Sequence, residues 1–234
     1  GFDRGRQGAG SVKTKLPLFP FARHPLLFGH RGCSAAAPEN TVAAFRKAVE
    51  SGVPGIELDV HRCGSGELVV IHDDTLKRTT GLDAPVAETD YADIAELDAG
   101  SWFGERFRGE RVPLLEQVFE LFGENVYYDI EIKNRERTCG ALERALVETV
   151  RNLGLAECVI VSSFNPFSLR EIKRLDPALR TALIYTSHPE LPLPFRNGGG
   201  RFICRPDVLK PAHEKVHRRS MFYKGRLAGY PVLP

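Results

Sequence analysis

Short apolar runs alternate with segments of helical periodicity along most of this 234-residue chain. This alternation constrains the fold strongly, because it predicts parallel strands joined by crossover helices. We therefore expect an α/β fold with a mainly parallel sheet. The expected strands are 26–28, 56–60, 68–71, 126–132, 158–161 and 181–185, and the expected helices are 41–51, 113–122, 141–153 and 167–175.

One connection is too short for a crossover helix. Only seven residues separate the second and third expected strands, and Gly64-Ser-Gly66 lies in the middle of them. A glycine-rich connection of this length predicts an antiparallel hairpin. If the turn centres near Ser65, the numbers of paired residues sum to about 130, which places His72 level with Leu58. A shift of one residue would turn His72 to the other face of the sheet.

Two stretches depart from the alternation. Residues 1–25 carry glycines, bases and prolines without a period, which predicts a flexible lead-in before a domain over 26–234. Residues from about 74 to 112 are rich in Thr, Gly, Asp and Ala, with one expected helix at 89–97. We interpret this second stretch as an insertion.

Composition excludes several classes of function. The 32 basic and 30 acidic residues leave a formal charge of +2, which gives no broad field to attract nucleic acid. No apolar run approaches the ~20 residues of a transmembrane segment. The five cysteines are odd in number and widely spaced, which favours reduced thiols and a cytoplasmic location, although a removed signal is compatible with a chain that starts at Gly1. Oligomeric state is not indicated by the sequence.

Acidic residues alternate with apolar residues in two of the expected strands. Glu57 and Asp59 share one face of the first, and Asp129, Glu131 and Lys133 share one face of the other. A single strand of this kind could simply face solvent, but its recurrence favours a polar cavity. In a barrel of parallel strands, side chains at the carboxyl ends of the strands converge on one mouth.

The type of acidic residue indicates the kind of ion that the cavity would take. Glu57, Asp59 and Glu131 come without matching cysteine ligands, and oxygen ligands suit one hard divalent cation, Mg²⁺ or Ca²⁺, better than zinc. Such an ion could bind a phosphodiester oxygen, with Arg31 and Lys133 as further cationic partners. Lys133 could instead be a plain ion-pair partner of Asp129 or Glu131.

Two histidines occupy the ends of apolar runs. His30 precedes Arg31-Gly32, and His72 precedes two aspartates. Imidazole titrates near neutrality, so both are candidates for proton transfer, although either could be a metal ligand. His61 adjoins the acidic strand and stays open as a candidate.

The segment between the first strand and the first helix carries a helix-start signal. Asn40 or Thr41 is expected to cap the helix, which explains most of the Pro-Glu-Asn-Thr run structurally. Glu39 could nevertheless reach the cavity, because the turn places it beside His30.

Eight short motifs occur in order along the chain: Phe28-Gly-His-Arg-Gly32, Pro38-Glu-Asn-Thr41, Glu57-Leu-Asp-Val60, Val69-Val-Ile-His-Asp73, Leu76-Lys-Arg-Thr-Thr80, Pro113-Leu-Leu-Glu116, Ile130-Glu-Ile-Lys133 and Ser162-Ser-Phe164. Their order and spacing resemble the glycerophosphodiester phosphodiesterase family. The resemblance covers 26–175 and continues as a trace at 203–207.

This resemblance implies a TIM-type (β/α) barrel with a small insertion. It also implies a metal-dependent phosphoric diester hydrolase that releases glycerol 3-phosphate and an alcohol from a small glycerophosphodiester. Carried over residue by residue, the resemblance implies that His30 and His72 are an acid/base pair. It implies that the metal ligands are Glu57, Asp59 and Glu131, and that the phosphate contacts are Arg31 and Lys133.

The chain departs from the family pattern at its end. The closing strand motifs of the family are missing before Pro234, so we expect a barrel without its final strand and irregular packing after Tyr185. Two alternatives stay open: a lysophospholipase D with an apolar channel, and a non-catalytic protein that binds glycerophosphodiesters. The aromatic candidates for such a channel are Trp102, Phe103 and Phe107.

Overall fold

The computed structural model describes residues 26–134, 140–189, 191–217, 225 and 230–233. The expected lead-in over 1–25 lies outside the described residues. None of the helices in the described part of the chain is long and apolar enough to cross a membrane.

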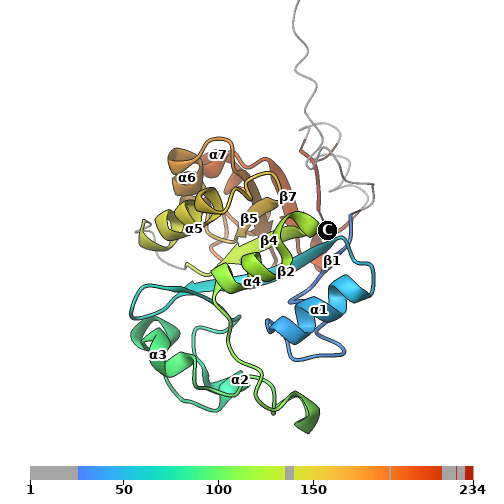
Figure 1. Cartoon of the computed structure of the whole chain (residues 1–234). Helices are drawn as coiled ribbons and strands as arrows, with labels where there is room; N and C mark the ends of the chain where they lie inside the picture. Colours follow the sequence, from blue (N-terminus) through green and yellow to red (C-terminus); the bar gives the residue numbers. More distant parts are fainter. Residues whose placement is uncertain (1–25, 135–139, 190, 218–224, 226–229, 234) are drawn as a thin grey trace, which may run out of the picture.

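Six parallel strands form one curled sheet that corresponds to part of a (β/α) barrel (Figure 1). Apart from the short hairpin strand, each strand pairs only with the strands that precede and follow it in the chain. Among the described residues, the first and last strands do not pair with each other, so the sheet is open. The parallel strands are β1 (Phe28–Gly29), β2 (Gly55–Arg62), β4 (Tyr127–Ile132), β5 (Val159–Ser163), β6 (Arg180–Tyr185) and β7 (Val208–Pro211).

The predicted hairpin is confirmed. Strand β3 (Leu68–Val70) runs antiparallel to β2, and Val60 faces Val70, so the paired numbers sum to 130 as expected. The strand ends two residues before His72, which therefore lies in the loop that follows the hairpin.

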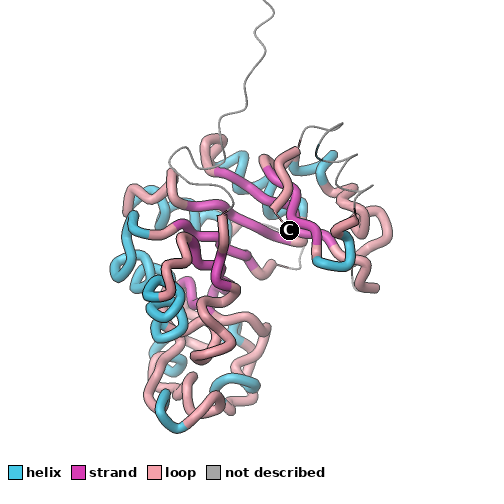
Figure 2. The backbone as a smooth tube through the Cα atoms, turned by 90° about the vertical axis from the view of Figure 1, so that its right-hand side faces the viewer, coloured by secondary structure: helices cyan, strands magenta, loops and turns pink. Residues whose placement is uncertain are grey.

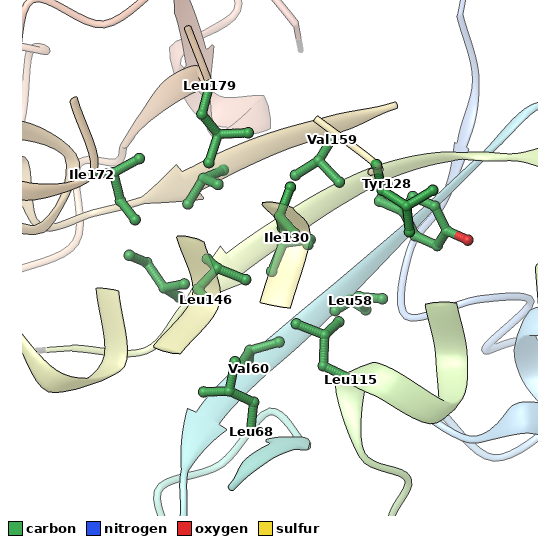
Figure 3. Close-up of a cluster of buried hydrophobic side chains, with 14 of the residues drawn as sticks. Leu58, Val60, Leu68, Leu115, Tyr128, Ile130, Leu146, Val159, Ile172 and Leu179 are labelled. Carbon is green, nitrogen blue, oxygen red and sulfur yellow. The ribbon is translucent and has the colours of Figure 1, made fainter. Parts of the chain in front are cut away.

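Helices cover the outer face of the sheet, and their apolar sides form the main core with the apolar residues of the strands (Figures 1 and 3). Leu58 of β2 and Ile130 of β4 lie in this core beside Leu115 and Leu146 of two helices. The helices that pack here are α1 (Val42–Glu50), α4 (Leu115–Phe122), α5 (Ala141–Asn152), α6 (Pro166–Leu175) and α7 (Arg201–Cys204). This arrangement directs the alternate, polar residues of β2 and β4 to the inner face.

The segment after β3 packs around a second, smaller core that it shares with Val69 of β3 and its neighbours Cys63 and Ile71. It contains α2 (Lys77–Thr80), α3 (Tyr91–Ile94) and two 3₁₀ turns, Val86–Glu88 and Glu105–Phe107. Leu76, Val86 and Ile94 are fully buried there. In Figure 1 this segment, which we call the lobe (74–112), lies below the sheet, and Figure 2 shows it as the lower part of the molecule.

Three expectations need correction. The helix expected to begin at Pro113 begins at Leu115, since Leu114 has extended backbone angles and is the residue before the first helical turn. The helix expected over 89–97 is the single turn α3. The stretch after Tyr185 is not irregular throughout, because α7 and β7 continue the alternation and Leu209 also bridges to Val232.

Candidate functional site

The strand register brings the predicted carboxylates together. Glu57 pairs with Asp129, and Asp59 pairs with Glu131, on neighbouring parallel strands. All four side chains are buried on the inner face of the sheet. Ligand oxygens of Glu57, Asp59 and Glu131 lie within 4.8 Å of one another, so the three predicted ligands form one cluster.

Two lysines neutralise part of this negative charge. Lys133, at the end of β4, places its Nζ 2.8 Å from Asp59 and also pairs with Glu131. Lys210, on β7, places its Nζ 2.7 Å from Asp129. The expected alternative, an ion pair of Lys133 with Asp129 or Glu131, is confirmed for Glu131, whereas Asp129 pairs with Lys210, which no sequence signal indicated.

The loop between β1 and α1 supports the cluster through backbone and side-chain contacts. The backbone N–H of Arg31 donates to Glu57 at 2.9 Å, and the Arg31 guanidinium lies 3.3 Å from Asp59. The side chain of Asn40 donates to Asp59 at 2.9 Å and accepts from the Asp59 backbone at 3.3 Å. Thr41 is the helix cap. Asn40 therefore positions a carboxylate, a role that the helix-cap interpretation did not give it.

This loop holds a compact backbone that few residues adopt easily. Arg31 and Asn40 have φ of 54° and 57°, and residues other than glycine held in this left-handed region cost about 1–3 kcal/mol each. Gly32, at φ 79°, lies so close to α1 that a Cβ there would come within 2.6 Å of the Ala44 backbone. The close packing on α1 thus fixes the turn that presents His30 and Arg31.

Together, burial and neighbouring charges raise the pKa of one carboxyl group of β2 and lower the pKa of the other. Burial, reinforced by the neighbouring Asp59, raises the pKa of Glu57 to about 8. Burial would also raise the pKa of Asp59, but the Lys133 ammonium lowers it. For Lys210, burial would lower the pKa, whereas the charges of Asp129 and Glu57 raise it.

The histidines occupy the rim of the cluster. The exposed His30 ring places its Nε2 4.0 Å from Glu57, and burial followed by the charge of Arg31 lowers the pKa of His30. The half-buried His72 ring places its Nδ1 2.7 Å from Asp73. His61 is buried, and its Nε2 lies 3.2 Å from the backbone oxygen of His72. The arrangement gives His61 a contact that supports the loop of His72.

The carboxylate cluster fits a hard divalent cation. Its donors are all carboxylate oxygens, which Mg²⁺ and Ca²⁺ prefer. Burial, followed by the charge of Asp59, raises the pKa of Glu57, and a divalent cation bound in the cluster would favour the ionised carboxylates. The structure thus brings the three predicted ligands into one compatible site and leaves the identity of the ion open.

A cavity of about 780 Å³ opens beside the cluster. Its lining includes His72, Glu131 and Lys133, together with Phe164 after β5, Phe167 at the start of α6, and polar and apolar residues of the loop after β6. The three aromatics proposed for an apolar channel do not line this cavity. They stack edge to face on one another in the lobe, as Trp102 with Phe103 and Phe103 with Phe107.

Another missed residue, Arg78, lies on α2 in the lobe. Its guanidinium donates to both Glu39 and Asp73. The Leu-Lys-Arg-Thr-Thr motif contained it, but no sequence pattern linked it to residues 39 positions away. Lys210 gave an even weaker signal, because the strand that carries it has only four residues.

Comparisons with known proteins show the family of this chain. The model of the glycerophosphoryl diester phosphodiesterase family matches residues 30–229. A curated glycerophosphodiester phosphodiesterase from Caldanaerobacter subterraneus is 45% identical over 161 residues, which are 68% of this chain and 66% of that protein. The chain belongs to the glycerophosphoryl diester phosphodiesterase family, and its match spans slightly less than two thirds of this relative.

Solved structures show the same fold. A glycerophosphodiester phosphodiesterase from Agrobacterium tumefaciens superposes with a TM-score of 0.73 at 29% identity, covering 88% of this chain and 84% of that one. An Oleispira antarctica phosphodiesterase in complex with its product sn-glycerol-3-phosphate has a TM-score of 0.76 at 29% identity, covering 89% and 83%. These neighbours confirm the predicted TIM-type architecture.

Proposed function

We propose that this protein hydrolyses glycerophosphodiesters to glycerol 3-phosphate and an alcohol. The observation that carries this proposal is the convergence of three carboxylates on the inner face of the sheet with two histidines and two cationic side chains around them, in a chain of this family. The Oleispira neighbour bound to sn-glycerol-3-phosphate supports the same substrate class.

The histidines divide the proton transfers in this proposal. The lowered pKa of His30 favours its neutral ring, which can accept a proton from the attacking hydroxyl group. The ionised Asp73 accepts from Nδ1 of His72, so Nε2 of His72 is left to deliver a proton to the leaving oxygen. A new phosphorus–oxygen bond forms to the attacking hydroxyl oxygen as the bond to the alcohol breaks, the alcohol leaves with the proton from His72, and the net reaction adds one water molecule.

The remaining side chains would bind the metal ion and the phosphate group of the substrate. Glu57, Asp59 and Glu131 would hold one Mg²⁺ or Ca²⁺ ion, which when bound supplies Lewis-acid stabilisation of a phosphate oxygen. Arg31 and Lys133 already contact these carboxylates, so their side chains lie where a phosphate group would also meet them.

A metal-dependent substrate panel tests the proposal. Purified protein with Mg²⁺ or Ca²⁺ is expected to release glycerol 3-phosphate from glycerophosphocholine and glycerophosphoethanolamine, measured by a coupled dehydrogenase assay. Chelation with EDTA is expected to abolish release, and added metal to restore it. Calorimetric binding of a diester without any release would contradict hydrolysis and favour the non-catalytic alternative.

The large cavity gives the second candidate a specific basis. A volume of about 780 Å³ with an apolar wall exceeds the needs of glycerol alone, because sites of ~300–1,000 Å³ hold drug-sized ligands. Lysophospholipids therefore belong in the same panel. Faster release of head group from a lysophospholipid than of alcohol from water-soluble diesters would favour the lysophospholipase D reaction.

A further inference from the structure

Five charged or ionisable side chains form a continuous chain of contacts, which joins the lobe to His72 in one direction and to Arg31 in the other. His72 contacts Asp73, Asp73 contacts Arg78, Arg78 contacts Glu39, and Glu39 contacts Arg31. Their sequence positions span 31–78, and only the fold brings them into one chain of contacts.

Arg78 is the centre of this line and binds two carboxylates at once. Its Nε and Nη2 donate to Asp73 at 2.6 and 3.0 Å, and its Nη1 and Nη2 donate to Glu39 at 3.0 and 2.7 Å. A planar guanidinium offers donors in a fixed fork, which a lysine ammonium cannot reproduce. Both carboxylates are thereby fixed in orientation.

Each of these two carboxylates accepts a hydrogen bond from a side chain of the proposed site. Asp73 accepts from Nδ1 of His72 at 2.7 Å, and Glu39 accepts from Nη1 of Arg31 at 2.9 Å. The Arg78 hydrogen bonds lower the pKa of Asp73. At Glu39, burial alone would raise the pKa, but the hydrogen bonds and charges of Arg78 and Arg31 together lower it. Both acids are therefore ionised near neutral pH and act only as acceptors.

Arg78 lies outside the apolar core of the lobe, and it has a ring contact there with Trp102, whose centroid is 6.0 Å from the guanidinium. Leu76, Val86 and Ile94 belong to that buried core, whereas the Arg78 side chain is 41% exposed. The position of Arg78 therefore points to the site rather than to the stability of the lobe.

We propose that Arg78 is a positioning residue, which orients His72 through Asp73 and holds Arg31 through Glu39. This inference rests on the function proposed above. It gives the lobe a role in the reaction, because Arg78 of α2 joins the loop that carries Arg31 to the loop that carries His72.

The test compares Arg78→Ala with Lys77→Ala. Lys77 precedes Arg78 on α2 and pairs with Asp83 at 2.6 Å, with both side chains mostly exposed, so it controls for loss of one positive charge from the same helix. Arg78→Ala is expected to lower kcat about 10- to 100-fold, as loss of a group that orients a site residue commonly does, with a smaller change in KM. Lys77→Ala is expected to keep the parent kcat, and both variants the parent melting temperature.

A conservative variant separates charge from geometry. Arg78→Lys keeps the charge but cannot bridge both carboxylates, so its kcat is expected to lie between those of the parent and Arg78→Ala. Equal kcat for Arg78→Ala and Lys77→Ala would overturn the proposal. A loss of kcat that only follows a matching loss of folded protein would overturn it as well.

A second measurement does not depend on turnover. In histidine-labelled protein, the ¹⁵N shifts of the His72 ring are expected to report a proton on Nδ1 in the parent and in Lys77→Ala, and a changed tautomer pattern in Arg78→Ala. An unchanged pattern in Arg78→Ala would contradict the positioning role. If the parent protein released no glycerol 3-phosphate, the proposed function would fail, and the ring shifts would still decide whether Arg78 orients His72.

Discussion

The carboxylates of the site and its histidines are held in opposite ways. Glu57, Asp59 and Glu131 project from the middle of paired strands and are almost fully buried. His30 and His72 lie in loops at the strand ends, with 69% and 33% of their side chains exposed. The charged cluster is therefore built into the sheet, whereas the groups proposed to move protons lie at its rim.

This difference suggests a division of labour. Buried carboxylates cannot reorient, so they offer a fixed set of oxygen ligands to a cation. Histidines at a rim can exchange protons with substrate and solvent. Changes in the rim are therefore expected to reduce activity without unfolding the protein, and changes in the sheet are expected to reduce both activity and stability.

The largest expected effect is on activity at the rim. His30→Ala and His72→Ala are each expected to lower kcat about 10²- to 10⁴-fold, because proton transfer to or from the reacting group is lost. Their free energies of unfolding, from urea titration, are expected to stay within about 0.5 kcal/mol of the parent, since these side chains make few buried contacts. His213→Ala, at a side chain that is 99% exposed, is the matched control. Undiminished turnover in either variant would remove that histidine from the mechanism.

A large effect on stability is expected inside the sheet. Lys210→Ala removes the partner of Asp129, whose side chain is only 1% exposed, and is expected to lower the free energy of unfolding by about 3–5 kcal/mol. Lys173 is a close control because it is equally shielded but pairs at 2.7 Å with Asp207, which is 40% exposed. Lys173→Ala is expected to cost about 1 kcal/mol or less. Equal losses in urea titration would show that burial of the partner does not decide the effect.

The sequence predicted the strand-borne half of the site better than the loop-borne half. Alternation in β2 and β4 places Glu57, Asp59 and Glu131 on one face, and parallel strands bring that face together. The turn at Gly64-Ser-Gly66 also predicted the correct hairpin register. These features depend on local periodicity, which a sequence displays directly.

The contacts that the sequence did not reveal join distant segments. Lys210 reaches Asp129 from a four-residue strand, too short to show a pattern. Asn40 carried a helix-cap signal that hid its contact with Asp59, 19 residues away. The cavity wall comes from loops after β5 and β6, so its aromatics could not be told from those of the lobe. Tertiary packing alone decides such contacts.

A smaller effect is expected where the loop meets the sheet. Asn40→Ala removes two hydrogen bonds to Asp59 and leaves that buried carboxylate with fewer partners, which is expected to cost about 1–3 kcal/mol of unfolding free energy. The same change should reduce activity, because Asp59 loses its orientation. Asn152→Ala, at the exposed end of α5, controls for the substitution itself and is expected to change stability by about 0.5 kcal/mol at most. If Asn40→Ala lost stability but kept the parent activity, Asn40 would be only a turn residue, because alanine is strained at its φ of 57° whatever the contact with Asp59.

The smallest expected effect concerns the apolar wall of the cavity. Phe167 lines the cavity and packs edge to face on Phe195, with ring centroids 6.4 Å apart. Phe167→Ala is expected to lower kcat/KM about threefold to tenfold for a diester with a bulky apolar alcohol, or about 1 kcal/mol of transition-state binding. For a diester with a small alcohol, the loss of kcat/KM should be smaller. Phe202→Ala, at a 75% exposed ring of α7, is the control and should leave kcat/KM unchanged for both substrates. Equal losses for both substrates would mean that Phe167 supports the loop without contacting the alcohol, and the rim would then select substrates by charge alone.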